Sequence, residues 1–129
     1  MRGVVGVVAA QLDGRAGLDG VLIAPPCFGM YAVSARVQNA PLVEVPLDDD
    51  GRRFSLDLVA LEDIIALGDV RVVFLCSPAN PTGQALSIKQ ISHLAKAAAG
   101  KAVLVLDEAY AEFSSVGSAV GLLGEFPHL

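Results

Sequence analysis

Two short runs of residues are apolar at every position, VVFLC at 72–76 and AVLVL at 102–106. Strands of this kind are buried on both faces, as happens when helices cover both sides of a parallel sheet. Between the two runs, Ser87 and Gln90 form a capping-box pattern at the start of a helical period that Gly100 closes. The spacing therefore predicts an α/β fold in which a strand–helix–strand crossover places both strands at the centre of a parallel sheet.

The other apolar patterns from residue 20 onward repeat this alternation of strands and helices. Asp57 is placed to cap one helix and Gly68 to end it. Pro46 falls inside the second predicted strand and favours the edge of the sheet for that strand. The predicted strands cover 21–24, 42–47, 70–76 and 102–106. Residues 27–31 lead into a predicted helix that ends near 38, and further helices are predicted over 58–67 and 87–99. Residues 1–19 lack this regularity, so we expect an irregular N-terminal segment followed by one domain, or part of one, over 20–129.

Charge and composition exclude several classes of partner. Nine basic against fourteen acidic side chains give a net charge of -5, so no basic surface for nucleic acid or anionic lipid is expected. Prolines interrupt the long apolar stretches, which argues against a transmembrane helix. The acidic cluster Asp48, Asp49 and Asp50 is interpreted as a solvated turn, and no metal site is expected. Two distant cysteines indicate no disulfide framework, and a cytoplasmic location is the default expectation.

Three of the predicted strands are followed by distinctive loops. In open parallel sheets, ligands bind at the carboxyl ends of the strands. The first strand is followed by PPCFGMY at 25–31, the third by SPANPTG at 77–83 and the fourth by DEAY at 107–110. We therefore expect Phe28, Tyr31, Asn80 and Asp107 to lie near one edge of the sheet.

Asp107 follows five apolar residues and is expected to be poorly solvated, so its carboxylate needs a partner. Backbone donors or a role in capping the following helix would satisfy it, and a cationic ligand is the alternative. A pyridinium ring is a cationic ligand that would suit Asp107 and the side chains expected near it. Asp107 could keep the ring nitrogen protonated, Asn80 and Tyr110 could donate hydrogen bonds to a ring oxygen, and Phe28 could stack on the ring face. Ordinary core packing is the competing interpretation for Phe28 and Tyr110.

With the closing GSAVGLLGEFPHL at 117–129, these motifs resemble, in their order and spacing, the fold-type-I pyridoxal-phosphate aminotransferases, and most closely the histidinol-phosphate aminotransferase family. The resemblance covers residues 20–129. It implies part of a three-layer α/β/α large domain with a mostly parallel sheet, and pyridoxal 5'-phosphate as cofactor. It also implies cofactor contacts from Asn80 and Tyr110 to the phenolic oxygen, from Asp107 to the pyridine nitrogen, and from Phe28 to the ring face.

The same resemblance implies a homodimeric enzyme that exchanges an amino group between histidinol phosphate and the 2-oxo acid 2-oxoglutarate in histidine biosynthesis. The family's Schiff-base lysine, in a Ser-Lys context beyond DEAY, is absent up to Leu129, and Lys89, Lys96 and Lys101 do not match it. The early glycine-rich phosphate loop and a late substrate-binding arginine are also missing. We therefore expect a fragment that is inactive alone. A noncatalytic truncated or degenerate homologue, and an aminotransferase acting on aromatic amino acids, stay open as alternatives.

Two other enzyme classes find little support in the sequence. VLVLDEA resembles the magnesium-binding strand of P-loop ATPases, but the one Gly-Lys pair, Gly100-Lys101, lacks the preceding glycine and the following Ser or Thr of a phosphate loop. GSAVG at 117–121 puts Ser118 outside the nucleophile position of a hydrolase elbow, so Ser118 is expected to be a helix cap.

Overall fold

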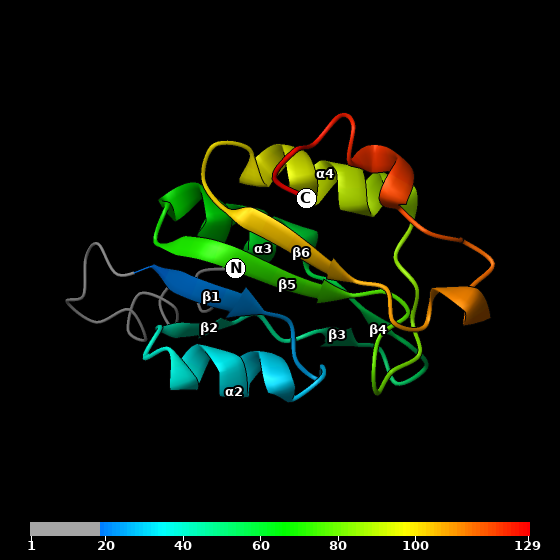
Figure 1. Ribbon diagram of the computed structural model, residues 1–129. Coiled ribbons are helices and arrows are strands. Elements are labelled where there is room, and N and C mark those ends of the chain that lie inside the picture. Colours follow the sequence, from blue (N-terminus) through cyan, green and yellow to red (C-terminus); the bar gives the residue numbers. More distant parts are fainter. Residues whose placement is uncertain (1–18) are drawn as a thin grey trace.

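The computed structural model describes residues 19–129 (Figure 1). Four parallel strands form a sheet in the order β2-β1-β5-β6, which confirms the predicted α/β fold with a parallel sheet. The strands are β1 (Gly20–Ile23), β2 (Leu42–Glu44), β5 (Val70–Cys76) and β6 (Val103–Asp107), and the helices are α2 (Met30–Val37), α3 (Leu58–Leu67) and α4 (Ile88–Ala98). Nearly all of the predicted N-terminal segment lies outside the described residues. None of the helices formed by residues 19–129 could span a bilayer.

Helices cover both faces of this sheet. The chain first moves from β1 outward to β2, and then returns past β1 to β5 and onward to β6. Because crossovers between parallel strands are right-handed, this reversal sends α2 to one face and α3 and α4 to the other (Figure 1). The direction of winding therefore switches between β1 and β5, and crevices that bind ligands open at such switch points.

Alternate residues of the central strands feed two separate apolar clusters. Leu22 and Val73 belong to the larger cluster, under α3 and α4, whereas Val21 and Ile23 belong to the smaller cluster, under α2. Both faces of β1 and β5 are thus covered, as the unbroken apolar run in β5 predicts. Within residues 19–129, strand β2 lies at one edge of the sheet as predicted, although Pro46, on which the prediction rested, follows the strand instead of lying inside it.

The helix-capping predictions are confirmed. Asp57 Oδ1 accepts a hydrogen bond from the Ala60 backbone N–H at 2.9 Å, and Gly68 ends α3 in the left-handed region with φ 80°. At the start of α4, Ser87 Oγ accepts from the Gln90 N–H at 3.2 Å while Gln90 Oε1 accepts from the Ser87 N–H at 2.9 Å. This reciprocal pair satisfies two donors that the first helical turn would otherwise leave without partners.

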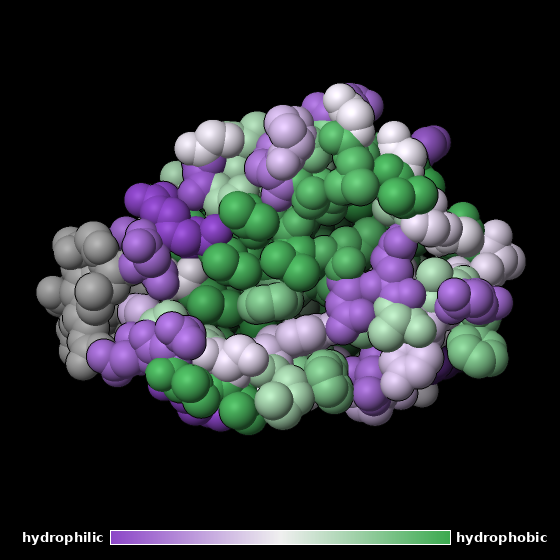
Figure 2. Space-filling model, viewed as in Figure 1, coloured by the Kyte–Doolittle hydropathy of each residue, from purple (hydrophilic) through white to green (hydrophobic). Residues whose placement is uncertain are grey.

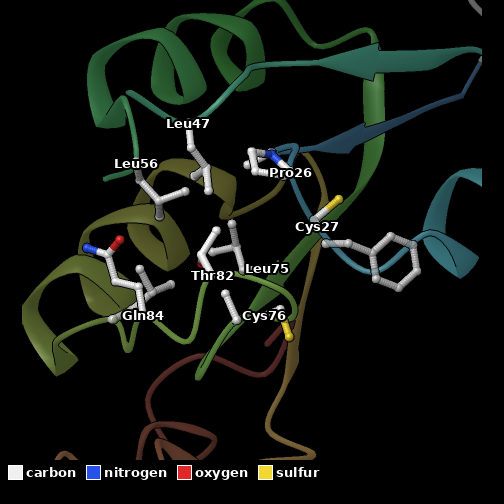
Figure 3. Close-up of a pocket in the computed structure, with 12 residues that line it drawn as sticks. Pro26, Cys27, Leu47, Leu56, Leu75, Cys76, Thr82 and Gln84 are labelled. Carbon is white, nitrogen blue, oxygen red and sulfur yellow. The ribbon is translucent and has the colours of Figure 1, made fainter. Parts of the chain in front are cut away.

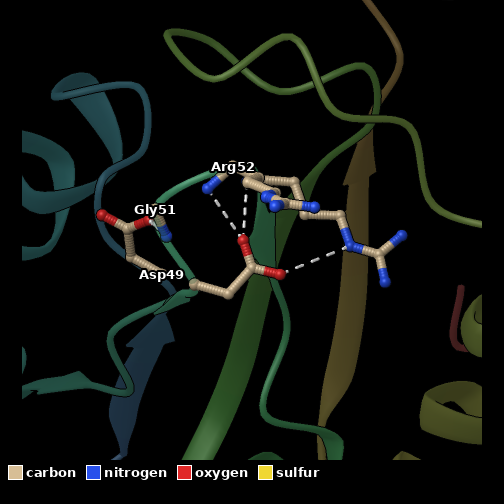
Figure 4. A network of polar contacts seen from close by, with 5 residues as sticks. Asp49, Gly51 and Arg52 are labelled. Atoms are coloured by element: carbon tan, nitrogen blue, oxygen red, sulfur yellow. Dashed lines mark hydrogen bonds and ion pairs between the residues drawn. The ribbon is translucent and has the colours of Figure 1, made fainter.

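The acidic cluster forms a hydrogen-bonded turn at the surface. Asp50 Oδ1 accepts from the backbone N–H groups of Arg52 and Arg53, each at 2.9 Å (Figure 4). Donation from Arg53 and then from Arg52 lowers the pKa of the Asp50 carboxyl below its ordinary value. The predicted strand 42–47 is too long: β2 stops at Glu44, and β3 (Asp48–Asp49) pairs antiparallel with β4 (Phe54–Ser55) across the turn.

The predicted central position of the last strand is wrong for the part of the chain that the structure describes. Strand β6 is the outermost strand there, and Val103 is 50% exposed. Apolar side chains gather over β6 and the segment after it (Figure 2), along a groove of about 310 Å³. The pattern misleads because an unbroken apolar run reports on the two faces of a strand and carries no information on how many strands lie beside it.

Removal of the Ser87 hydroxyl tests the cap of α4. We expect Ser87→Ala to lower the free energy of unfolding by about 1 kcal/mol, because the N–H of Gln90 loses its acceptor. Urea denaturation of the 129-residue chain measures the change. The matched control is Ser34→Ala, which removes an exposed hydroxyl inside α2 without removing a cap. Equal effects of the two substitutions would contradict the assignment of Ser87 as the stabilising cap.

Candidate cofactor site

Four side chains that the sequence singles out line one cavity of about 80 Å³. They are Phe28, Asn80, Asp107 and Tyr110, and Cys76 and Ala109 complete the lining. Phe28 follows β1, Asn80 follows β5, and Asp107 ends β6 opposite Cys76 in the parallel register. The cavity therefore lies at the carboxyl ends of the strands, beside the switch point, where a ligand is expected in an open parallel sheet.

Both oxygens of the Asp107 carboxylate have donors. The Tyr31 hydroxyl donates to Oδ2 at 2.6 Å, and the backbone N–H of Ala109 donates to Oδ1 at 3.0 Å. Asp107 is half-buried, as expected after an apolar strand. Its partners within the described residues are one phenol and one backbone N–H, so the predicted backbone donor is found and the predicted helix cap is not. A carboxylate offers about four acceptor positions, which leaves room for a further N–H donor from a ligand.

The loop that carries Asn80 is fastened to the end of β6. The backbone N–H of Ser77 donates to the carbonyl of Asp107 at 2.9 Å, and Ser77 Oγ accepts from the N–H of Leu86 at 2.8 Å. A further backbone bond from Gly83 to Ala79, 2.7 Å long, closes the turn around Asn80. These backbone hydrogen bonds hold Asn80 near Asp107, and both residues line the same cavity.

The aromatic residues at the mouth are not core residues. Phe28 is 41% exposed and Tyr110 is 43% exposed, so core packing is the wrong interpretation for both. Tyr110 also lines an adjoining groove of about 320 Å³ together with Asn80 and Phe113. The two rings and the amide are accessible to a planar ligand.

Tyr31 also belongs to the site. The sequence predicted that it lies near the same edge of the sheet as Phe28, but it did not predict a contact for it. Tyr31 is only 7% exposed, and its ring stacks on Phe74 with a centroid distance of 4.7 Å and an interplanar angle of 6°. Burial, and then hydrogen bonding to Asp107 and Cys76, raises the pKa of the Tyr31 phenol far above its ordinary value, which keeps it a proton donor. The only local signal was an aromatic residue three positions after Phe28.

A second cavity, of about 30 Å³, lies next to the site and is lined by Cys27, Leu47, Leu56 and Thr82 among others (Figure 3). Its lining is mostly aliphatic, and it is too small for an aromatic ring. Burial, followed by the negative charge of Glu44 and the proximity of Cys76, raises the pKa of the Cys27 thiol. This cavity shares Cys76 with the site, and Thr82 Oγ1, one of its few polar groups, is buried without a hydrogen-bond partner among the described residues.

Other residues weighed in the sequence lie away from the cavity. Lys89, Lys96 and Lys101 are exposed, and none of them lines it. Glu108, next to Asp107, is a structural residue, since its Oε1 accepts from the backbone N–H of Ala119 at 2.6 Å. Ser118 Oγ accepts from the N–H of Val120 at 3.1 Å, but the N-cap of the short helix Val120–Leu122 is Ala119, without a side-chain cap, so the predicted capping role of Ser118 is wrong.

Comparison with known proteins shows the family to which the chain belongs. The family model described as aminotransferase class I and II matches residues 6–126. The chain belongs to this aminotransferase family. The matched region begins before residue 20, so the predicted boundary between residues 1–19 and the domain stays a prediction.

Among curated relatives, a histidinol-phosphate aminotransferase of Xanthomonas axonopodis pv. citri is 53% identical over 111 residues, which are 86% of this chain and 31% of the relative. The chain thus spans about a third of the length of the curated relatives it matches. The crystal structure of the histidinol-phosphate aminotransferase from Clostridium acetobutylicum superposes with a TM-score of 0.74 at 24% identity, over 98% of this chain and 36% of that one. Cystalysin from Treponema denticola, whose structure contains pyridoxal 5'-phosphate, superposes with a TM-score of 0.68 at 22% identity, over 85% of this chain and 28% of that one. These similarities confirm the predicted fold-type-I architecture.

The raised pKa of Cys27 gives a test of the local environment. In a Cys76→Ser variant Cys27 is the only thiol, and we expect its alkylation by iodoacetamide to reach half-maximal rate at a higher pH than a free cysteine, because only the thiolate reacts. Glu44→Gln should move this midpoint to lower pH by removing a negative charge, whereas Glu125→Gln should leave it unchanged. A midpoint at or below that of free cysteine would contradict the described burial.

Proposed function

We propose that this chain forms the central part of the cofactor domain of a pyridoxal 5'-phosphate-dependent aminotransferase that acts on histidinol phosphate, with 2-oxoglutarate as the amino acceptor, in histidine biosynthesis. The observation that carries the proposal is the convergence of Phe28, Asn80, Asp107 and Tyr110 on one cavity at the carboxyl ends of the strands. The similarity to histidinol-phosphate aminotransferases supports the choice of amino donor.

The lining of the cavity fits a protonated pyridine ring with an adjacent oxygen. Asp107 would hold the ring nitrogen protonated, because a carboxylate favours a positive charge beside it. The Asn80 amide and the Tyr110 hydroxyl would donate hydrogen bonds to the ring oxygen, and the exposed ring of Phe28 would cover the face of the pyridine. When bound, this cofactor supplies an electron sink for the negative charge that develops on the substrate carbon.

The proposed amino donor rests on the similarity to histidinol-phosphate aminotransferases, and no described residue is shown to touch a substrate. The proposed assembly rests on the family resemblance of the motifs alone. Aromatic amino acids are the second donor class, because the cavity residues recognise the cofactor ring and not the imidazole. The complete enzyme would be a homodimer. We also propose that residues 1–129 alone do not turn over substrate, since Lys89, Lys96 and Lys101 lie on the exposed surface and away from the cavity.

A chimeric enzyme tests the proposal. The matching 111 residues of the Xanthomonas histidinol-phosphate aminotransferase are replaced by those of this chain, and amino transfer from histidinol phosphate to 2-oxoglutarate is measured with added cofactor. We expect turnover by the chimera and none by the 129-residue chain. Asp107→Asn in the chimera should lower kcat/KM about 10²–10³-fold, because the group that stabilises charge on the ring loses its negative charge.

The matched control is Asp50→Asn, which changes an exposed aspartate in the surface turn and should leave kcat/KM unchanged. A folded chimera whose activity survives Asp107→Asn would contradict the role given to Asp107. Turnover by the 129-residue chain would contradict its inactivity.

A further inference from the structure

Tyr31 connects two parts of the candidate site that are distant in sequence. The residue belongs to α2, on the face of the sheet opposite α3 and α4, and its hydroxyl reaches Asp107 at the end of β6, 76 positions further along the chain. The O–O distance of 2.6 Å lies in the range of hydrogen bonds from a hydroxyl to an ionised carboxylate, which are stronger than bonds between neutral groups.

The phenol is held firmly where it meets the carboxylate. The Tyr31 ring stacks on the ring of Phe74 in β5. The Phe28 ring packs edge-to-face against the Tyr31 ring, with their centroids 5.6 Å apart and their planes at 83°. Tyr31 also belongs to the buried cluster under α2. Its hydroxyl therefore cannot leave Asp107 without disrupting these ring contacts, and buried side chains are confined to few rotamers.

The second oxygen of Asp107 is fixed independently. The backbone N–H of Ala109 donates to Oδ1, so the two donors together set the rotation of the carboxylate plane. A hydrogen bond made only to hold the fold would not need to end on a half-buried carboxylate that lines a cavity. Phe28 and Asp107, both lining that cavity, touch the same tyrosine.

We propose that Tyr31 is a positioning residue: its hydroxyl orients the Asp107 carboxylate toward the ring nitrogen of the cofactor, while its ring supports Phe28 against the face of the ring. This inference rests on the proposed function, and it assigns a role to a residue that does not itself line the cavity. Tyr31→Phe is the sharpest probe, because it removes the hydroxyl and keeps the ring that stacks on Phe74.

The first measurement requires no ligand. In the NMR spectrum of the 129-residue chain, we expect a downfield, slowly exchanging hydroxyl proton from Tyr31 that moves upfield in Asp107→Asn and stays in place in Asp50→Asn. Absence of this signal, or its indifference to Asp107→Asn, would overturn the positioning role whatever ligand the cavity takes.

The second measurement compares two probes, pyridoxine 5'-phosphate and the same molecule with its ring nitrogen replaced by C–H, titrated into the chain by NMR. We expect Tyr31→Phe to raise the Kd of the pyridine probe about three- to tenfold and to leave the Kd of the carbon analogue unchanged. Tyr110→Phe is the matched control, because its hydroxyl serves the ring oxygen that both probes carry. It should weaken both equally.

The outcomes separate the two proposals. If Tyr31→Phe weakens both probes to the same extent, or neither, while the urea midpoint of the variant matches the original chain, the hydroxyl does not position Asp107 for the ring nitrogen and the inference is wrong. If the original chain binds neither probe although the Tyr31 hydroxyl signal is present, the proposed cofactor site fails, and the inference that rests on it fails with it.

Discussion

The parallel pairing of β1 with both β2 and β5 is the constraint on which the rest of the structure depends. A strand paired in this way must be followed by crossovers in opposite directions, and right-handed crossovers then cover both faces of the sheet. Strands β1 and β5 are apolar because helices bury both of their faces. The position of the cavity also follows from this pairing, because the two crossovers diverge at the carboxyl ends of these strands.

The site combines a carboxylate with neutral donors on a rigid frame. The side chains that line it come from the last residues of β5 and β6 and from the loops after β1, β5 and β6, which backbone hydrogen bonds such as that from Ser77 to Asp107 hold in place. Tyr31 is the one contributor from a helix, and it couples the apolar cluster under α2 to the charged group. Packing of the ring and orientation of the carboxylate therefore depend on each other.

Much of this could be predicted from local patterns. The four strands of the parallel sheet, the caps at Asp57 and Ser87, and the site residues Asn80 and Asp107 follow from periodicity, capping chemistry and the geometry of parallel sheets, although the second strand is shorter than predicted. Periodicity reports which faces of an element are buried, and it does not report neighbours. The edge position of β6 and the pairing of β3 with β4 were missed for that reason, and the contact between Tyr31 and Asp107 depends on tertiary packing across 76 residues.

A crystal structure of the 129-residue chain with pyridoxine 5'-phosphate tests the central claim most directly. The ring nitrogen should lie about 3 Å from a carboxylate oxygen of Asp107, with the ring oxygen between Asn80 and Tyr110 and the ring face against Phe28. Tyr31 should keep its bond to the carboxylate. A ring bound elsewhere, for example in the apolar groove along β6, with Asp107 contacting only protein, would contradict the assignment of this cavity as the cofactor site.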